Sequence, residues 1–247
     1  MYSKELVTLY GKAPGKVLTI MAGVHGNEVC GLHAFDRVVP NLSIDFGIVH
    51  FIVGNLQAVS LKERDTGANL NRMFKAEHEL SPIERTSYER KRALELMPIL
   101  SSSHALLDIH SSSSRVSTPF IICEPHSFLI ARRLDFPIRS NGWDILEPGG
   151  TDYYVNRCGG HGICVECGYH EDLEAISFAG LAILDFLRIM GSLCDHKSMP
   201  FERPNQREVR VVGVHKVKSK YTPARPFADF EVLVKGALIG WDGEGEL

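Results

Sequence analysis

The chain has 247 residues, of which 44% are hydrophobic and 23% charged, and its formal net charge is −3. This composition is typical of a soluble globular protein with one large domain and room for a small second one. The near-neutral charge provides no basic field for nucleic acid. The first residues lack the apolar core of a secretory signal, and no apolar run reaches membrane-spanning length. We therefore expect a cytoplasmic protein without nucleic-acid or membrane partners.

Strand-like and helix-like runs alternate along most of the chain. Five apolar runs of strand length predict strands over 17–24, 47–54, 104–110, 119–124 and 163–167. Apolar residues at helical spacing predict helices over about 28–39, 82–100, 126–134 and 171–190. Near-continuous apolar strands suit a sheet that is covered on both faces. We expect an α/β domain over residues 1–199, with helices flanking the sheet.

The sequence changes character near Met199-Pro200. Residues 208–220 and 230–240 favour strands separated by turn residues, and no helical periodicity remains. A small β domain is therefore expected over residues 200–247. Two or three strands are a poor independent domain, so either they pack on the main domain or the chain is a shortened form.

Six cysteines do not suggest a disulfide framework in a chain of this length. Cys164 and Cys167 have the spacing of a redox or zinc motif, but they lie in a predicted strand. Residues three apart on a strand point to opposite faces, which favours packed core thiols.

His25 and Glu28 directly follow the first long apolar run, and Gly26 between them removes a side chain where the backbone must turn tightly. A catalytic zinc site uses three nitrogen or oxygen ligands and keeps a position for water. The best third ligand is His110, which ends the predicted strand 104–110. Ligands bind at the carboxyl edge of such sheets, where these side chains would meet.

Asp108 lies two residues before His110 and so on the same face of the strand. Metal-bound imidazoles usually donate their second N–H to a carboxylate or carbonyl. We expect Asp108 to serve that role, most simply for His25. An H-x-x-E pattern alone is weak evidence, and a histidine at a strand end is commonly only a surface residue.

Four motifs occur in order along the chain: Gly23 to Glu28 (G-x-H-G-N-E), Asn69 to Arg72 (N-L-N-R), Asp108 to His110 (D-x-H) and Val165 to Gly168 (V-E-x-G). Together they resemble the succinylglutamate desuccinylase/aspartoacylase family, a branch of the zinc carboxypeptidase fold. The resemblance covers roughly residues 17–190, and the C-terminal part also resembles that family's β domain.

The resemblance implies a role for each matching residue. One Zn²⁺ per chain would be held by His25, Glu28 and His110, with Asp108 behind a ligand. Glu166 would be the catalytic acid and base, and Arg64 would polarise the scissile carbonyl. The resemblance further implies that Asn71 and Arg72 hold a substrate carboxylate, for which the planar guanidinium fork is well shaped.

The chain departs from the family pattern at Asn69, where Asp is common. Ser111 to Ser114 follow His110 and either contact substrate or form a polar loop. The chain is also expected to stop before the family's usual final strands, which can shape access to the site.

We expect a zinc-dependent hydrolase that cleaves the amide bond of a small N-acyl amino acid. Two alternatives remain open: a zinc carboxypeptidase acting on peptides, and a ligand-binding relative that has lost catalysis. The sequence leaves open the acyl group, the amino acid, the physiological metal and whether the chain forms a homo-oligomer.

Overall fold

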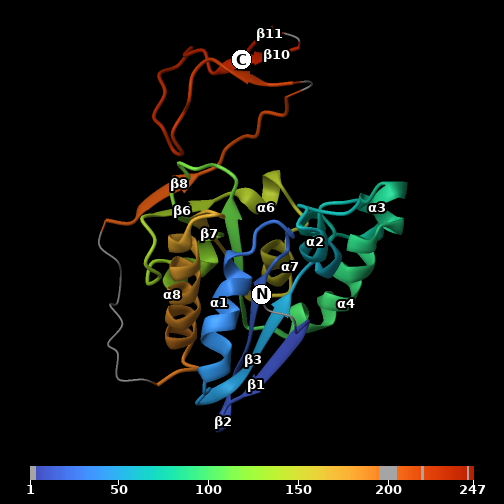
Figure 1. Cartoon of the computed structure of the whole chain (residues 1–247), viewed down its shortest axis with the longest axis vertical. Coiled ribbons are helices and arrows are strands. Elements are labelled where there is room, and N and C mark those ends of the chain that lie inside the picture. Colours follow the sequence, from blue (N-terminus) through green and yellow to red (C-terminus); the bar gives the residue numbers. More distant parts are fainter. Residues whose placement is uncertain (1–3, 195–204, 218–219, 244) are drawn as a thin grey trace.

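The computed structural model describes residues 4–194, 205–217, 220–243 and 245–247. These residues form an eight-stranded mixed sheet with helices on both faces, and the C-terminal residues add a small antiparallel sheet (Figure 1). The predicted α/β class, the mixed sheet and the small C-terminal β element are confirmed. The strand order in the large sheet is β1-β3-β2-β4-β7-β5-β6-β8.

The described residues contain strands and helices with the following bounds. The strands are β1 Leu6–Tyr10, β2 Ala13–Ala22, β3 Phe46–Val53, β4 Ala105–Ser112, β5 Phe120–Cys123, β6 Ile138–Asn141, β7 His161–Tyr169, β8 Arg207–Arg210, β9 Thr222–Pro223, β10 Gly240–Asp242 and β11 Gly245–Glu246. The α-helices are α1 Cys30–Val38, α2 Leu56–Leu61, α3 Pro82–Thr86, α4 Tyr88–Ser102, α5 Phe128–Ala131, α6 Trp143–Leu146, α7 Thr151–Arg157 and α8 Leu173–Met190. Short 3-10 helices are η1 Val39–Asn41, η2 Leu70–Arg72, η3 Glu77–Glu79 and η4 Pro125–Ser127.

Four parallel strands, β3, β2, β4 and β7, form the centre of the large sheet. Their carboxyl ends therefore meet at one edge, where ligand sites of such sheets form. Strand β5 runs antiparallel to β7 and pairs Phe120 with Glu166. Because of this reversal, the first residue of β5 lies at the same edge as the last residues of β4 and β7.

Helices cover both faces of the sheet and bury its apolar side chains. Helices α1 and α8 pack against each other on one face (Figure 1), around Phe35, Phe51 and Phe186. Helices α4 and α7 cover the other face, around Leu70 and Leu100. This double cover explains why β4 is buried along almost its whole length.

The five strands and four helical regions expected in the catalytic part are all present, with shifts at their ends. The helix expected over 82–100 is two helices, because Ser87 ends α3 and caps α4 by accepting a hydrogen bond from Arg90 N at 3.0 Å. Strands β1 and β6 and the short helices α2, α6 and α7 were not predicted from the sequence. These short elements are too brief to show a clear period.

The C-terminal part contains less strand than its sequence suggested. Strand β8 joins the large sheet beside β6, and three very short strands make the small sheet. Residues 211–217 and 230–239 contain no strand, although both runs are rich in β-branched residues. Val212, Val232 and Val234 are largely exposed, so strand propensity without a neighbouring edge did not produce a strand here. The predicted boundary at 199–200 falls outside the described residues.

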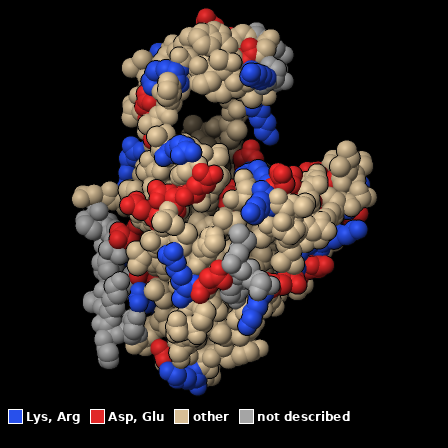
Figure 2. Space-filling model, viewed as in Figure 1, with Lys and Arg blue, Asp and Glu red and all other residues tan. Residues whose placement is uncertain are grey.

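The C-terminal segment arches over the main body and leaves an opening beneath it (Figure 2). Basic and acidic side chains are interspersed on the visible face. Within the described residues, no helix is both long enough and apolar enough to cross a membrane.

Candidate metal centre and active site

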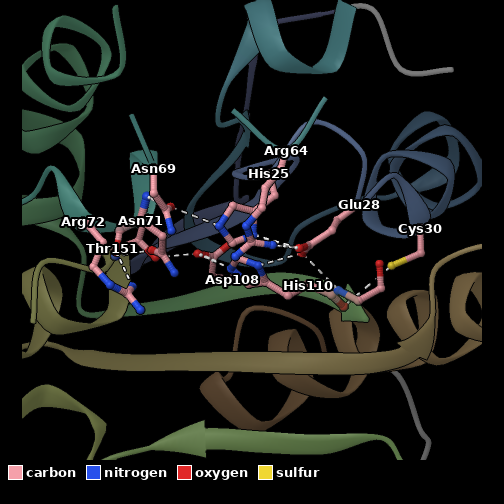
Figure 3. Close-up of polar contacts among 11 residues, drawn as sticks. His25, Glu28, Cys30, Arg64, Asn69, Asn71, Arg72, Asp108, His110 and Thr151 are labelled. Atoms are coloured by element: carbon pink, nitrogen blue, oxygen red, sulfur yellow. Dashed lines mark hydrogen bonds and ion pairs between the residues drawn. The ribbon is translucent and has the colours of Figure 1, made fainter. Parts of the chain in front are cut away.

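Three buried side chains converge at the carboxyl edge of the sheet (Figure 3). His25 follows β2, Glu28 precedes α1, and His110 lies on β4. One candidate ligand atom from each lies within 4.8 Å of the other two. The structure thus brings together the three residues that the sequence singled out as metal ligands.

The donor set fits a divalent metal such as zinc. Each oxygen of Glu28 faces one imidazole: Oε1 lies 2.8 Å from His25 Nδ1, and Oε2 lies 2.9 Å from His110 Nδ1. Ligand atoms around one tetrahedral zinc are separated by about 3.4 Å, so a small expansion would admit the ion. His25 Nδ1 is buried and has no hydrogen-bond partner of acceptable geometry among the described residues. Two nitrogens and a carboxylate are the donor types of catalytic zinc sites.

The two imidazoles also keep the Glu28 carboxylate ionised. Burial raises the pKa of Glu28, but the hydrogen bond from His110 and the proximity of both imidazoles outweigh burial and hold the pKa well below its usual range. A carboxylate must be ionised to bind a metal, so Glu28 is ready in this respect.

The turn between His25 and Glu28 requires the glycine at position 26. A Cβ atom added to Gly26 would lie 2.0 Å from the carbonyl carbon of Ala58 in α2. Gly26 N also donates a hydrogen bond to Arg64 O at 3.2 Å. The glycine is needed for this close approach to α2, which brings His25 and Glu28 to the same point.

Each imidazole is oriented by a second polar group, but the pairing differs from expectation. Asn69 Oδ1 lies 3.1 Å from His25 Nε2, whereas Asp108 Oδ2 lies 3.1 Å from His110 Nε2. The expected contact of Asp108 with His25 is therefore wrong. Asp108 and His110 lie two residues apart on β4 and therefore on the same face, so the Asp108 carboxylate lies next to the His110 imidazole. Thr151 donates a hydrogen bond to the same carboxylate.

Glu166 and Arg64 lie beside the three converging side chains. Glu166 is on β7, directly opposite His110 in the β4–β7 ladder. Burial raises the pKa of Glu166 to about 7, which suits a group that accepts and returns a proton near neutral pH. Arg64 NH1 donates to Glu28 Oε1 at 2.9 Å, and half of its side chain is exposed.

Arg72 and Asn71 lie on the opposite side of His25 from Glu28 (Figure 3). Arg72 Nε and NH2 both contact Glu147 Oε2, at 2.9 and 2.7 Å, and NH1 donates to Asn71 O. These contacts use three of the five guanidinium donors and leave one N–H on each of NH1 and NH2. That remaining fork has the shape that binds a carboxylate with two hydrogen bonds. Thr151 N donates to Asn71 Oδ1 at 3.0 Å, which fixes the Asn71 amide so that its Nδ2 is the side-chain donor.

Two adjoining cavities meet at this centre and share His25, Arg64, Phe120 and Glu166. The first has a volume of about 500 Å³ and is lined mainly by polar residues of the 111–117 region and by the Asp229-Phe230 pair. The second has a volume of about 200 Å³ and is lined by Asn71, Arg72 and, besides the shared Glu166, three further acids, Asp144, Glu147 and Asp152. The reacting centre therefore lies where two differently lined compartments join.

Several residues of the site were not found from the sequence. Asn69 was noted only as a departure from a motif, and Glu147, Thr151 and Phe230 carried no signal of their own. Their contacts with Arg72, Asp108 and Phe120 all join residues far apart in the chain. Only the fold shows which of many polar loop residues reach the centre.

Comparisons with known proteins identify the family of the chain. A family model described as the succinylglutamate desuccinylase/aspartoacylase catalytic domain matches residues 14–188. An N-acyl-aromatic-L-amino acid amidohydrolase (carboxylate-forming) from Xenopus tropicalis is 28% identical and covers 93% of this chain and 85% of its own length. A probable aspartoacylase from Acaryochloris marina is 29% identical over 45% of this chain. The chain spans 40% of that relative's length, and 49% of a second probable aspartoacylase from Prochlorococcus marinus.

Solved structures share the fold at low sequence identity. A succinylglutamate desuccinylase from Vibrio parahaemolyticus superposes with a TM-score of 0.75 at 17% identity, covering 98% of this chain and 78% of its own. A succinylglutamate desuccinylase/aspartoacylase from Rhodobacter sphaeroides gives a TM-score of 0.73 at 19% identity, covering 96% and 76%. With the family model spanning every strand of the central parallel sheet, the chain belongs to the succinylglutamate desuccinylase/aspartoacylase family.

Proposed function

We propose that this protein is a metal-dependent amidohydrolase that cleaves the amide bond of a small N-acyl amino acid. The observation that carries the proposal is the convergence of His25, Glu28 and His110 next to a partly buried acid of raised pKa, Glu166. Membership of a family that includes deacylases of amino acids supports it.

His25, Glu28 and His110 would hold one divalent ion, which we propose to be zinc. When bound, such an ion activates a water molecule and polarises a carbonyl oxygen. Glu166 would take the proton from the attacking water and return it to the leaving amine. A pKa of about 7 lets its carboxyl do both at neutral pH.

Arg64 and Arg72 would have separate roles in the reaction. Arg64 is half exposed and could turn from Glu28 to the carbonyl oxygen, where its positive charge would stabilise the developing oxyanion. Arg72 would offer its remaining NH1–NH2 fork to the carboxylate of the amino acid, and Asn71 would add its amide donor. Glu147 holds the guanidinium in place for this purpose.

The experiment is a rate measurement on N-acyl amino acids with zinc-loaded protein, beside the Glu166→Gln variant. We expect the variant to lose activity by roughly two to four orders of magnitude at unchanged metal content. Peptides with free carboxyl termini serve as the comparison that separates a deacylase from a carboxypeptidase. Equal rates for parent and variant would remove Glu166 from the mechanism, and no cleavage by the zinc-loaded parent would leave the ligand-binding alternative.

A further inference from the structure

The C-terminal segment supplies part of the wall of the larger cavity. Asp229 Oδ2 accepts hydrogen bonds from Ser117 Oγ and Thr118 N, both at 3.0 Å. These contacts fasten residues 229–230 to the connection between β4 and β5. Asp229 and Phe230 both line the larger cavity, which is also lined by His25 and Glu28.

Phe230 is held in a strained conformation at this wall. Its φ is 58°, in the left-handed region that bulky side chains rarely adopt. Its ring packs edge to face against Phe120, with centroids 5.0 Å apart, and Arg207 lies 5.7 Å from its centroid. Strain of this kind persists where the surroundings determine the position of a residue, which is common at ligand sites.

The position of Phe120 links this wall to the reacting centre. Phe120 pairs with Glu166 across the β5–β7 ladder and lines both cavities. If Asn71 and Arg72 hold the amino acid in the smaller cavity, the acyl group must extend from the shared centre into the larger one. Its far end would then meet the Asp229-Phe230 pair.

The charges of the larger cavity are unfavourable for an acidic acyl group. The described residues that line it include three carboxylates, those of Glu28, Glu166 and Asp229. Arg64 is the only lysine or arginine among the same lining residues, and it already contacts Glu28. A metal would compensate charge at the centre, but Asp229 lines the same cavity beside the hydroxyl of Ser117.

We propose that the Asp229-Phe230 pair determines acyl specificity in the function proposed above, so that the preferred acyl group is uncharged and its length is limited by the Phe230 ring. The ring stops the acyl chain, and the carboxylate of Asp229 repels a terminal carboxylate such as that of a succinyl group. In this proposal, residues 229–230 of the C-terminal segment select the acyl group of the substrate.

The test uses N-acetyl, N-hexanoyl and N-succinyl derivatives of aspartate, glutamate, lysine and phenylalanine. For zinc-loaded parent protein we expect kcat/KM about tenfold higher for N-acetyl than for N-succinyl forms of the same amino acid. Phe230→Ala should raise kcat/KM for N-hexanoyl forms about tenfold, mainly by lowering KM. It should change kcat/KM for N-acetyl forms by no more than about threefold. Asp229→Asn keeps an acceptor oxygen for Ser117 and Thr118 and should raise kcat/KM selectively for N-succinyl forms.

Phe227→Ala is the matched control, because Phe227 belongs to the same segment but stacks on Arg225 and does not line the cavity. Thermal unfolding of each variant shows whether the segment remains folded, and Phe230→Leu gives a milder truncation if alanine disrupts it. A preference of the parent for succinyl groups would overturn the inference. So would an effect of Phe230→Ala and Phe230→Leu on kcat/KM that is the same for every acyl group.

A binding measurement separates this inference from the proposed function. Zinc-loaded Glu166→Gln protein is titrated calorimetrically with the same compounds, with and without Phe230→Ala. If the parent cleaves nothing but the acyl preference in binding changes as described, the hydrolase proposal fails and the specificity inference stands. If the compounds bind without any change in acyl preference, or do not bind, the specificity inference fails.

Discussion

Asn69 shows how one uncharged side chain can do the work of a carboxylate. Its Oδ1 accepts from the backbone of Asn71 at 2.9 Å and lies 3.1 Å from His25 Nε2. An acceptor at Nε2 places the proton there and leaves Nδ1 with its lone pair toward Glu28 and a metal. The departure from the common family pattern thus retains the orienting contact but gives up a charge.

Replacing Asn69 should therefore change metal affinity in two directions. Asn69→Ala removes the acceptor and should weaken zinc binding by roughly tenfold or more. Asn69→Asp restores a charged acceptor and should bind zinc at least as tightly as the parent. Competition with a chromophoric chelator measures both affinities. Equal affinities in all three proteins would mean that His25 is oriented by other contacts.

Asp152 makes stability depend on pH. Burial raises its pKa to about 6, with nearby Asp144 adding to the effect. The folded state therefore binds the proton more tightly than the unfolded chain, whose aspartates titrate near 3.9. As the pH rises from about 4 through 6, the folded state loses this advantage, so the free energy of unfolding decreases.

The Asp152→Asn variant should lose this dependence. Relative to the parent, its free energy of unfolding should increase by about 1 kcal/mol between pH 5 and pH 8. Urea unfolding at the two pH values measures the difference, with the exposed Asp36→Asn as control. A constant difference between variant and parent at both pH values would contradict the assignment.

At the scale of elements, helix α4 organises the connection that carries Arg64. Its buried Glu89 accepts hydrogen bonds from Thr66 N at 2.8 Å and Thr66 Oγ1 at 2.7 Å through one oxygen, and from Ala68 N at 3.2 Å through the other. Asn55 Nδ2 donates to the same carboxylate at 3.3 Å. Residues 62–68 form no helix or strand, and hydrogen bonds to the Glu89 carboxylate hold this connection in place.

Removing this carboxylate should loosen the connection. Glu89→Ala leaves several buried donors without an acceptor and should lower the free energy of unfolding by about 3 kcal/mol. Glu89→Gln keeps one acceptor oxygen and should cost less. Urea unfolding gives the stabilities, and Glu95→Ala, an exposed acid on the same helix, should change stability by less than about 1 kcal/mol. A similar loss in the two alanine variants would refute a special role for Glu89.

The sequence was informative where an element follows from local pattern. The run before His25 and the run ending at His110 are almost continuously apolar, so both strands and the position of both histidines could be predicted. The partners Asn69, Glu147 and Glu89 could not, because each contact depends on how separate connections pack. Asp108 was placed on the right strand but given the wrong imidazole, since alternation fixes the face and not the neighbour.

The whole molecule should become more stable when a metal binds. The three candidate ligands come from β4 and from the turn between β2 and α1, so an ion held by them would link separate parts of the chain. At a zinc concentration 100 times Kd, binding should add about 3 kcal/mol to the free energy of unfolding. Differential scanning calorimetry before and after a chelator measures the shift in Tm.

Two variants show whether that shift in Tm arises from zinc bound at the candidate site. His25→Ala should abolish the response to zinc, whereas His33→Ala, which removes a more exposed histidine of α1, should keep it. A zinc response that survives in His25→Ala would place the ion elsewhere on the protein.

The reversed direction of β5 has a consequence for how this protein could diversify. The connection between β4 and β5 begins just after a candidate metal ligand and ends at Phe120, and Asp229 is fastened to its middle. Insertions or deletions there would move this wall of the larger cavity without shifting the strands that bear His110 and Glu166. Length variation in one surface loop is thus a route to new substrates that spares the chemistry.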